Sequence, residues 1–373
     1  MKKKSLYEMI YDDLLGQIKE GKYTQGSRLP SEKDLADSYR VSRITSKKAL
    51  ERLAEEDFIV RMPGKGSFVK DQQPEEQEDI SEKTAFSPQQ PQLIGVVMEG
   101  FAESFGTKLV LGMEEEFRKY EYNMIFRCSR GNQKEEEKAI NDLLSLNVQG
   151  LIVMCAHDEN YSPKILELAV SGFPIILLDR QMKGVPLSFV GTNNHDAARD
   201  LTDYLFEKNH RKIAFISSSA MDTPTIADRF SGFVDSNLAH GIITNETMWV
   251  TNLRATIPDV QADEGMMEED LLKLKRFLLE HPEVTAYFVV EYEIAKMLKK
   301  ALKEVYGEIA DTKEVVCFDG PDNVVHEFEF THIRQDELKI GKTAADMLFD
   351  TIQGHRDIRC SYLPYEIVIG YNN

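Results

Sequence analysis

A regular alternation of apolar and helical segments between residues 93 and 320 places the strongest constraint on how this chain can fold. Apolar runs such as LIGVVM (93–98), GLIVMCA (150–156) and KIAFISS (212–218) are typical of buried strands, and segments with helical periodicity separate them. Short buried strands that alternate with helices form parallel sheets covered on both faces. The alternation occurs twice, so we predict an α/β body with two lobes, each a doubly wound parallel sheet.

The body is expected to span residues 93–373, and the chain is expected to cross between the lobes near residues 179–193 and 318–323. In parallel sheets of this kind, ligands bind beyond the carboxyl ends of the strands. The segments at these ends are the first candidates for a binding site, namely residues 93–99, 150–159, 179–193, 217–223, 291 and 318–321.

A different composition marks residues 71–92, which are rich in Gln, acidic residues and Pro and contain almost no apolar side chains. Such a segment cannot bury enough surface to offset the entropy of ordering it. We interpret it as a flexible linker that separates the body from a head formed by residues 1–70.

The head has the pattern of a winged helix-turn-helix. A first helix is predicted by an apolar stripe with helical spacing, formed by Leu6, Ile10, Leu14 and Ile18. Ser31 and Ser42 are typical N-caps and predict two further helices, which extend to about residues 39 and 56, with Asp34 completing a capping box at Ser31. Two strand-like runs within residues 58–69 flank a Gly-Lys-Gly turn and predict a β-hairpin wing.

Charge is distributed unevenly between the head and the body. The net charge of the chain is −18, but residues 1–70 contain 15 basic and 11 acidic side chains, whereas the remainder contains 30 and 52. Because phosphate would repel the acidic body, DNA contact is expected only at the head. Arg43 and Lys47 lie one turn apart at the start of the third helix, where a helix-turn-helix contacts base edges. Taken alone, these two residues could also be an ordinary solvated helix face.

The segment YDDLLGQIKEGKYTQGSRLPSEKDLADSYRVSRITSKKALERLAEEDFIVRMPGKGSFV resembles the winged-helix head of the gluconate-repressor (GntR) family. The motifs that match are Leu-Pro-Ser-Glu, Val-Ser-Arg-x-Thr, Ala-Leu-x-x-Leu and the Gly-Lys-Gly-Ser-Phe-Val wing. The resemblance implies binding to double-stranded operator DNA through Glu32, Lys33, Ser42, Arg43, Ile44, Thr45, Lys47, Gly64 and Lys65. The chain departs from the family at Ser46, Lys47 and Asp57, where an aliphatic residue, Arg and Gly are common, and Lys47 lacks the planar fork of Arg.

Residues 93–373 resemble the effector domain of the lactose and galactose repressors (the LacI/GalR family), which is itself similar to periplasmic sugar-binding proteins. The matching segments are LIGVVM, QGLIVMCA, PIILLDR, AARDLTDYLFEKNHRKIAFI, DRFSGF, VVCFDG and THIRQDELKIGKTAADML. A GntR-type head on a LacI-type body is the arrangement of arabinose repressors. The resemblance implies a homodimer that binds a small effector, arabinose or another monosaccharide, in the cleft between the lobes.

The side chains expected to line this cleft are Glu99, Phe101, Phe105, His157, Asp158, Arg229, Glu291 and Asp319. The resemblance implies binding roles for Arg229 and Asp319, which supply donors and acceptors for vicinal hydroxyls, and Phe101 or Phe105 could stack on a pyranose face. The alternatives are a structural pair formed by Arg229 and Asp319, a core position for Phe105, and a solvated loop position for Asp158.

Glu291 and Tyr292 stand where the family commonly has Asn-Asp, so the ligand could differ from a neutral monosaccharide. A regulator that responds to a nucleobase or a phosphorylated compound is therefore the alternative function. A sugar-processing enzyme is the alternative from another class, but no HExxH, GxSxG, P-loop or dinucleotide-binding pattern is present. The His and Cys residues have no metal-ligand spacing, and we predict no catalytic residue, no cofactor and no metal.

The sequence also predicts a cytoplasmic location. No run of ~18 apolar residues is present, and acidic residues at positions 8, 12 and 13 interrupt any signal sequence. The four cysteines are widely spaced and are expected to be buried, reduced thiols: Cys128, Cys155, Cys317 and Cys360. We therefore predict a cytoplasmic, sequence-specific DNA-binding regulator, a repressor of a sugar-utilisation operon that a small sugar releases from its operator.

Overall fold

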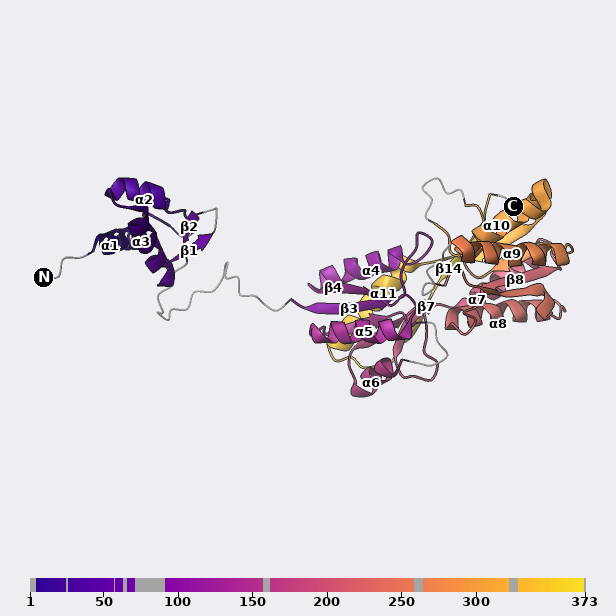
Figure 1. Ribbon diagram of the computed structural model, residues 1–373. Helices are drawn as coiled ribbons and strands as arrows, with labels where there is room; N and C mark the ends of the chain where they lie inside the picture. Colours follow the sequence, from indigo (N-terminus) through magenta and orange to yellow (C-terminus); the bar gives the residue numbers. More distant parts are fainter. Residues whose placement is uncertain are drawn as a thin grey trace. The chain divides into compact units, whose positions relative to one another are not determined.

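The computed structural model describes residues 5–24, 26–56, 58–62, 66–70, 91–156, 162–257, 264–321 and 328–371. The chain divides into two compact units, Met1–Ser87 and Pro88–Asn373, which are the head and the body (Figure 1). Of the predicted linker 71–92, only the last two residues lie within the described part of the chain.

The head contains three helices and a β-hairpin. The helices are α1 (Leu6–Lys19), α2 (Glu32–Tyr39) and α3 (Arg43–Glu55), and the antiparallel strands are β1 (Ile59–Met62) and β2 (Gly66–Val69). The predicted apolar stripe of α1 is confirmed in part, because Ile10 and Leu14 are buried against Leu50 and Leu53 of α3, whereas Leu6 is exposed. Gly64 and Lys65, predicted to form the turn of the wing, lie outside the described residues.

The local caps of the head are confirmed. Ser31 and Asp34 form a capping box at the start of α2, and the hydroxyl of Ser42 accepts a hydrogen bond of 3.2 Å from the Thr45 N–H at the start of α3. Ser46, where an aliphatic residue is common in the family, is fully buried, and its hydroxyl donates to the carbonyl of Glu32 at 2.7 Å. This bond joins α3 to the first turn of α2 and so helps to fix the angle between the two helices.

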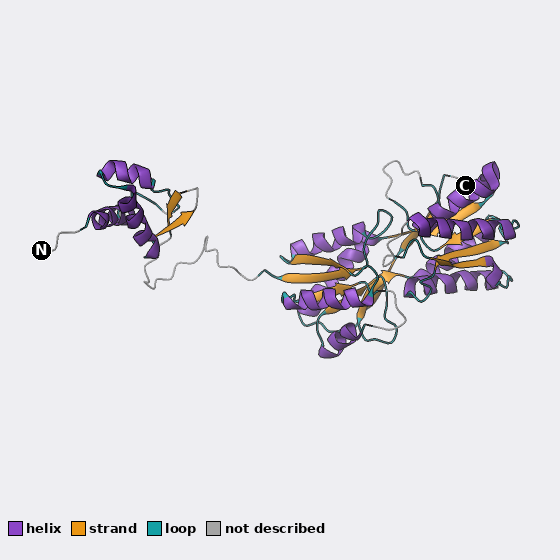
Figure 2. Cartoon of the chain, in the orientation of Figure 1, coloured by secondary structure: helices purple, strands orange, loops and turns teal. Residues whose placement is uncertain are grey.

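The N-terminal lobe of the body is a six-stranded sheet in the order β13-β7-β6-β5-β3-β4, with every pair parallel. Its strands are β3 (Leu93–Met98), β4 (Asn123–Cys128), β5 (Gly150–Val153), β6 (Ile175–Leu178), β7 (Ser188–Thr192) and β13 (Cys360–Leu363). Its helices are α4 (Thr107–Lys119), α5 (Gln133–Ser145), α6 (Pro163–Ser171) and α11 (Glu337–Ile352). Helices cover both faces of this sheet, as predicted (Figure 2).

The C-terminal lobe repeats this architecture, with the sheet order β14-β12-β11-β10-β8-β9. Its strands are β8 (Ile213–Ser218), β9 (Trp249–Leu253), β10 (Ala286–Val289), β11 (Glu314–Phe318), β12 (Thr331–Gln335) and β14 (Tyr365–Val368). Its helices are α7 (Asn194–Glu207), α8 (Pro224–Ala239), α9 (Glu264–Glu280) and α10 (Tyr292–Tyr306), with the short 3-10 helices η1 (Glu246–Met248) and η2 (Gly307–Thr312). The edge strand β14 pairs antiparallel with β12, so this sheet is not wholly parallel as predicted.

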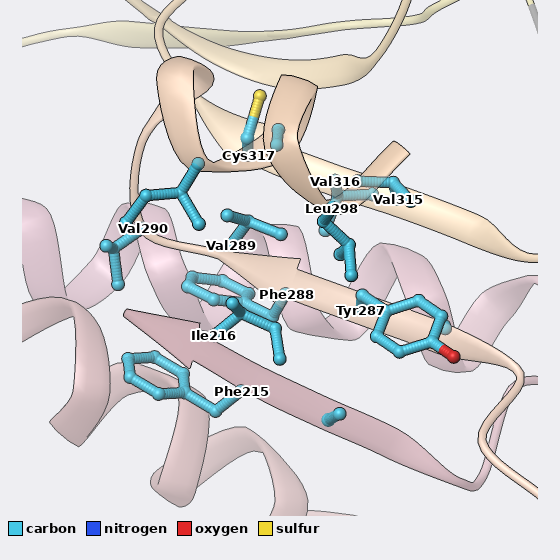
Figure 3. Close-up of a cluster of buried hydrophobic side chains, with 14 of the residues drawn as sticks. Phe215, Ile216, Tyr287, Phe288, Val289, Val290, Leu298, Val315, Val316 and Cys317 are labelled. Carbon is cyan, nitrogen blue, oxygen red and sulfur yellow. The ribbon is translucent and has the colours of Figure 1, made fainter. Parts of the chain in front are cut away.

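The core of the C-terminal lobe is built from the inward faces of its central strands. Phe215 on β8 stacks with Phe288 on β10 at a ring separation of 5.6 Å, and Leu298 of α10 belongs to the same buried cluster (Figure 3). These side chains come from continuous apolar runs, as is typical of strands covered on both faces.

The crossings between the lobes differ from the prediction. The first lies at Asn193, where β7 of one lobe leads into α7 of the other, at the end of the predicted range 179–193. The predicted crossing near 318–323 is wrong, because β11 and β12, the described strands on either side of this range, are neighbours in one sheet. The chain instead crosses at Asp336, between β12 and α11, and at Pro364, between β13 and β14. Figure 1 shows α11, in yellow, among the magenta helices of the N-terminal lobe.

Glycines allow close helix packing at equivalent places in both lobes. A Cβ atom on Gly112 of α4 would lie 2.3 Å from the carbonyl oxygen of Leu338 in α11. A Cβ atom on Gly232 of α8 would lie 2.1 Å from the carbonyl oxygen of His195 in α7. In each lobe, the helix that follows a crossing packs closely against a neighbouring helix. The pairs are α11 with α4 and α7 with α8, and each contact has no room for a side chain at the glycine.

The cysteines are only partly as predicted. Cys317 is buried and Cys155 is half-buried, but Cys128 and Cys360 are exposed. The reason is their position, since Cys128 ends β4 and Cys360 begins β13, the two edge strands of the N-terminal sheet. None of the described helices is both long and apolar enough to cross a membrane.

Candidate DNA-binding and effector sites

The exposed face of α3 carries the predicted DNA-contacting side chains. Arg43, Ile44 and Lys47 project from its first turns and are exposed, and Ile44 has 79% of its surface accessible although it is a large apolar residue. Ser42, at the N-cap, is exposed, and Thr45 is partly buried with its hydroxyl 2.9 Å from that of Ser42. A cationic helix start with an exposed aliphatic side chain can contact base edges and thymine methyl groups in the major groove.

The two predicted contacts on α2 differ from each other. Lys33 is exposed. Glu32 is partly buried, and its carboxylate pairs with the guanidinium of Arg61 on β1, which also lies 3.5 Å from Glu51 of α3. Glu32 therefore joins the helix-turn-helix to the wing, a role that the sequence pattern did not predict.

A cavity of about 640 Å³ lies between the two lobes of the body. Six of the eight predicted effector-contacting residues line it, and they come from both lobes: Glu99, Phe101, Phe105, Arg229, Glu291 and Asp319. His157 and Asp158 lie outside the described residues. The cavity volume falls within the range of about 300–1,000 Å³ that is usual for small-molecule sites.

On the side of the N-terminal lobe, an ion pair and a buried carboxyl group lie at the strand ends. The guanidinium of Arg180 contacts the carboxylate of Glu99 at 2.6 Å and donates to the carbonyl of Cys155 at 2.8 Å. The neighbouring Asp179 has only 6% of its surface exposed, and its Oδ1 has no hydrogen-bond partner among the described residues. Burial raises the pKa of the Asp179 carboxyl group above its ordinary value.

On the side of the C-terminal lobe, Arg229 is held by its neighbours. Its Nε donates to Oδ1 of Asn194 at 2.8 Å and its guanidinium donates to the carbonyl of Val290 at 2.6 Å, while its plane lies 3.8 Å from the ring centre of Phe318. Asp319 accepts a hydrogen bond of 2.8 Å from the amide of Gln335. No hydrogen bond or ion pair joins Arg229 directly to Asp319 in the described part of the chain. The alternative that the two residues form a structural pair is therefore not supported, although their charges still interact.

Glu291 occupies the N-cap of α10 and is half-buried. Its Oε1 lies beneath the cavity surface and makes no hydrogen bond of normal geometry among the described residues, but the hydroxyl of Thr256, which also lines the cavity, lies close enough to favour the ionised carboxylate. Burial raises the pKa of Glu291 to about 7 and that of Asp319 to about 6. Both groups can therefore change protonation state near neutral pH.

The two aromatic candidates have different surroundings. Phe101 is 55% exposed at the cavity and contacts Phe126 edge to face at 5.6 Å. Phe105 is partly buried and packs against the core of the N-terminal lobe, as the alternative interpretation proposed, although it also lines the cavity. Of these two candidates, Phe101 is therefore the one whose ring is exposed enough to stack on a ligand.

The sequence did not single out Asp179, Arg180 or Thr256 as site residues. Asp179 and Arg180 lie within the strand-end range 179–193. The rule for parallel sheets therefore included this range but gave no reason to choose these two residues from it. A signal for Asp179 was available in its likeness to Asp319, since each follows a buried strand directly. Their backbones are alike as well, with φ of 61° and 63°, a left-handed conformation that Asp tolerates better than most residues.

Comparisons with known proteins agree with this architecture. Residues 6–69 match the family of bacterial regulatory proteins of the gntR type, and residues 92–366 match the family of periplasmic binding proteins and sugar binding domains of the LacI family. The chain is 24% identical over 365 residues to an arabinose metabolism transcriptional repressor of Geobacillus stearothermophilus, which covers 95% of this chain and 93% of that protein. It is 24% identical over 256 residues to catabolite control protein A of Priestia megaterium, covering 68% of this chain and 73% of that protein.

Solved structures share the fold. A complex of the transcriptional regulator CelR with cellobiose has a TM-score of 0.64 at 19% identity and covers 92% of this chain and all of that one. The transcription regulator CcpA of Lactococcus lactis has a TM-score of 0.62 at 21% identity and covers 74% of this chain and 97% of that one. With its two six-stranded lobes, the cavity between them and the matched residues 92–366, the chain belongs to the family of periplasmic binding proteins and sugar-binding domains of the LacI type, joined to a GntR-type DNA-binding head.

Proposed function

We propose that this protein is a transcriptional repressor of a sugar-utilisation operon, and that a small sugar bound between the lobes of the body releases it from its operator. The observation that carries the proposal is the presence, in one chain, of an exposed cationic helix start on α3 and of a cavity lined by both lobes. The full-length relative named as an arabinose metabolism repressor supports it.

The head would bind DNA by placing α3 in the major groove. Arg43 can direct two N–H donors to guanine, Ile44 can contact a thymine methyl group, and Lys33 and Lys47 can neutralise phosphates or reach base edges. A homodimer would present two heads to a palindromic operator, with half-sites about one helical turn or a multiple of it apart. Serine N-caps hold α2 and α3 in place for this contact.

The body would act as the switch. Because Glu99 and Asp179 belong to one lobe and Arg229, Glu291 and Asp319 to the other, a ligand that contacts both sets is bound better when the lobes are closer together. The ligand shifts the equilibrium between lobe arrangements by its difference in affinity for them. Three chain segments cross between the lobes, so a change in the angle between the lobes affects both sheets at once.

The lining of the cavity favours a sugar over the phosphorylated compound considered as an alternative effector. Carboxyl groups from both lobes face the cavity, and both guanidinium groups already bond to protein atoms. A phosphate would meet net repulsion there. Hydroxyl groups of a sugar can instead donate to the carboxylates, with Phe101 beneath the ring.

The test is to measure binding of the full chain to DNA from upstream of its own gene, by fluorescence anisotropy between about 50 and 200 mM salt. We expect affinity that falls steeply with salt and that is lost when a monosaccharide is added from a panel of pentoses, arabinose included, hexoses and amino sugars. A scrambled DNA of the same length is the control.

Equal affinity for both DNAs would contradict the proposal for the head, and operator binding that no small molecule changes would contradict it for the body. We also propose that the cavity performs no reaction. Recovery of a chemically altered sugar after incubation with the protein would favour an enzyme instead.

A further inference from the structure

We propose that the effector carries a positively charged nitrogen, and that it is an aminated sugar rather than a neutral one. This inference rests on the proposed function, because it specifies the ligand of the same cavity. It concerns the carboxyl groups of the lining. The cavity holds more of them than are needed to accept hydrogen bonds from the hydroxyl groups of a neutral sugar.

The inner part of the cavity holds more negative than positive groups. Its carboxyl groups are those of Glu99, Asp179, Glu291 and Asp319, and its cations are Arg180 and Arg229. Their charges form one cluster, because Arg229 interacts with Asp319, Asp179 and Glu291 together. With every group ionised, two negative charges remain without compensation in a site from which much of the water is excluded.

Oδ1 of Asp179, whose residue is more than nine-tenths buried, has no hydrogen-bond partner among the described residues. The carboxyl group of Glu291 has the Thr256 hydroxyl beside it, but its Oε1 makes no hydrogen bond of normal geometry. Asp179 and Glu291 come from different lobes and line the same cavity. A buried acceptor without a donor is costly, so these oxygens mark the place where a ligand would supply N–H groups.

The nearby cations are already bonded to protein atoms. Arg180 contacts Glu99 and the carbonyl of Cys155, and Arg229 contacts Asn194 and the carbonyl of Val290. At the exposed rim of the cavity, Lys296 pairs with Glu293 at 2.6 Å, and Lys300 is solvated. The surplus of carboxyl groups therefore faces the ligand, and a bound cation would favour their ionised forms.

The remaining lining favours a sugar as the carrier of this nitrogen. Ser218, Thr223 and Thr256 add hydroxyl groups to the cavity, and Phe101 adds an exposed ring. An aliphatic polyamine has no hydroxyl groups to match this polar lining, and an amino acid would bring its own carboxylate against the acidic lining.

The experiment compares amino sugars with neutral sugars on the full chain. Calorimetry with glucosamine, galactosamine and mannosamine, each against its parent hexose and its N-acetyl derivative, is carried out at pH 6.5, where most of the free amine is protonated. We expect at least one amino sugar to bind about tenfold or more tightly than its two neutral counterparts. Binding should release protons, because the cation favours the ionised form of Glu291, whose pKa is about 7 in the free protein.

Two variants identify the groups that recognise the charge. Glu291→Gln and Asp179→Asn keep the size of each side chain, and Asn tolerates the left-handed backbone of residue 179. Each is expected to weaken binding of the amino sugar about tenfold more than binding of the neutral parent, and Glu291→Gln should abolish most of the proton release. Glu308→Gln, an exposed change of the same charge on η2, is the matched control and should leave both affinities unchanged.

Two results would overturn the inference. One is equal or tighter binding of the neutral hexoses, and the other is failure of every amino sugar to bind. Operator binding and its release are measured in parallel. If a neutral sugar releases the DNA, the repressor function stands and the charged effector is wrong, whereas absence of specific DNA binding is a failure of the proposed function.

Discussion

The head and the body place their functional side chains in opposite surroundings. In the head, Arg43, Ile44 and Lys47 stand exposed on one helix, within five residues of sequence. In the body, Asp179 and Arg229 are buried and come from different lobes. A surface that contacts a long, charged polymer can be built locally, whereas a cavity that encloses a small molecule needs side chains from distant parts of the chain.

The head and the body also differ in the direction in which they shift the pKa values of carboxyl groups. In the head, hydrogen bonds from Ser31 lower the pKa of Asp34, and hydrogen bonds from Tyr11 and Arg52 lower that of Glu56. In the body, burial raises the pKa of Glu136 and of Glu291 to about 7. The head therefore uses charged carboxylates to stabilise its fold, while the body holds several carboxyl groups in surroundings that oppose their charge.

The largest effect is expected from removing the cations of α3. The double change Arg43→Ala and Lys47→Ala should weaken operator binding about a hundredfold or more, because it removes base and phosphate contacts together. Effector binding by the body should not change. Anisotropy with operator DNA and calorimetry with the effector measure the two properties, and unchanged DNA affinity would contradict the role assigned to α3.

A smaller effect is expected from a methyl group added at a helix contact. Gly112→Ala places a Cβ atom 2.3 Å from the Leu338 carbonyl, which should destabilise the body by about 1–3 kcal/mol. Gly16→Ala in α1 is the matched control, because its Cβ would have no atom within 4 Å, and it should stabilise the head by about 0.5–1 kcal/mol. Hydrogen exchange on peptides from each region reports the two changes separately. Unchanged or increased stability of the body in Gly112→Ala would show that the contact between α4 and α11 is not tight.

The next effect is a dependence on pH that differs between the regions. The pKa of Glu136 is about 7 in the folded body, above its ordinary value of 4.5, so the folded state binds more protons and the body loses stability as the pH rises through this window. The contribution of Asp34 in the head has the opposite sign, since its pKa is lowered from 3.8. It is present above that value and is lost only as the pH falls through the lowered pKa.

Glu136→Gln removes the titrating group but keeps an acceptor for the Ala156 N–H, which Glu136 now binds at 2.6 Å. It should reduce the loss of body stability between pH 5 and pH 8 by roughly 1–2 kcal/mol. Hydrogen exchange at several pH values measures this, with Glu56→Gln in the head as the control. An unchanged pH profile of the body would rule out Glu136 as a source of the dependence.

The smallest effect is expected at the helix caps of the head. Ser42→Ala removes the acceptor for the Thr45 N–H and should destabilise the head by about 1 kcal/mol. Ser38→Ala, at an exposed position inside α2, changes the same side chain without removing a cap and should have little effect. Denaturation followed by exchange in α3 measures the difference, and equal stability of the two variants would contradict the role of the cap.

Local signals predicted the elements of the head and most of those of the body. The caps at Ser31 and Ser42 and the apolar runs of the strands act within a few residues, so they can be recognised in the chain itself. The last part of the body was not predicted as elements. Residues 331–368 form β12, α11, β13 and β14, which alternate between the two lobes, and nothing in their periodicity indicates which sheet each one joins.

The predicted cleft residues show the same limit. The strand-end rule placed Glu99, Glu291 and Asp319 at one cavity, and the family resemblance added Arg229. The strand-end rule gave no reason to distinguish Asp179 from other residues at strand ends. Whether its Oδ1 has a hydrogen-bond partner depends on which residues surround it in the folded protein. Glu32 was assigned to DNA by resemblance, but its pairing with Arg61 depends on the position of the wing.

The sequence by itself determined the division into a cationic head and an acidic two-lobed body, because capping, apolar periodicity and charge act over short distances along the chain. Only the tertiary structure decided where the chain crosses between the lobes, at Asn193, Asp336 and Pro364, and which carboxyl groups share one cavity. The burial and the hydrogen-bond partners of these carboxyl groups depend on residues far apart in sequence. The carboxyl groups therefore come together in one cavity only after both lobes have folded and packed together.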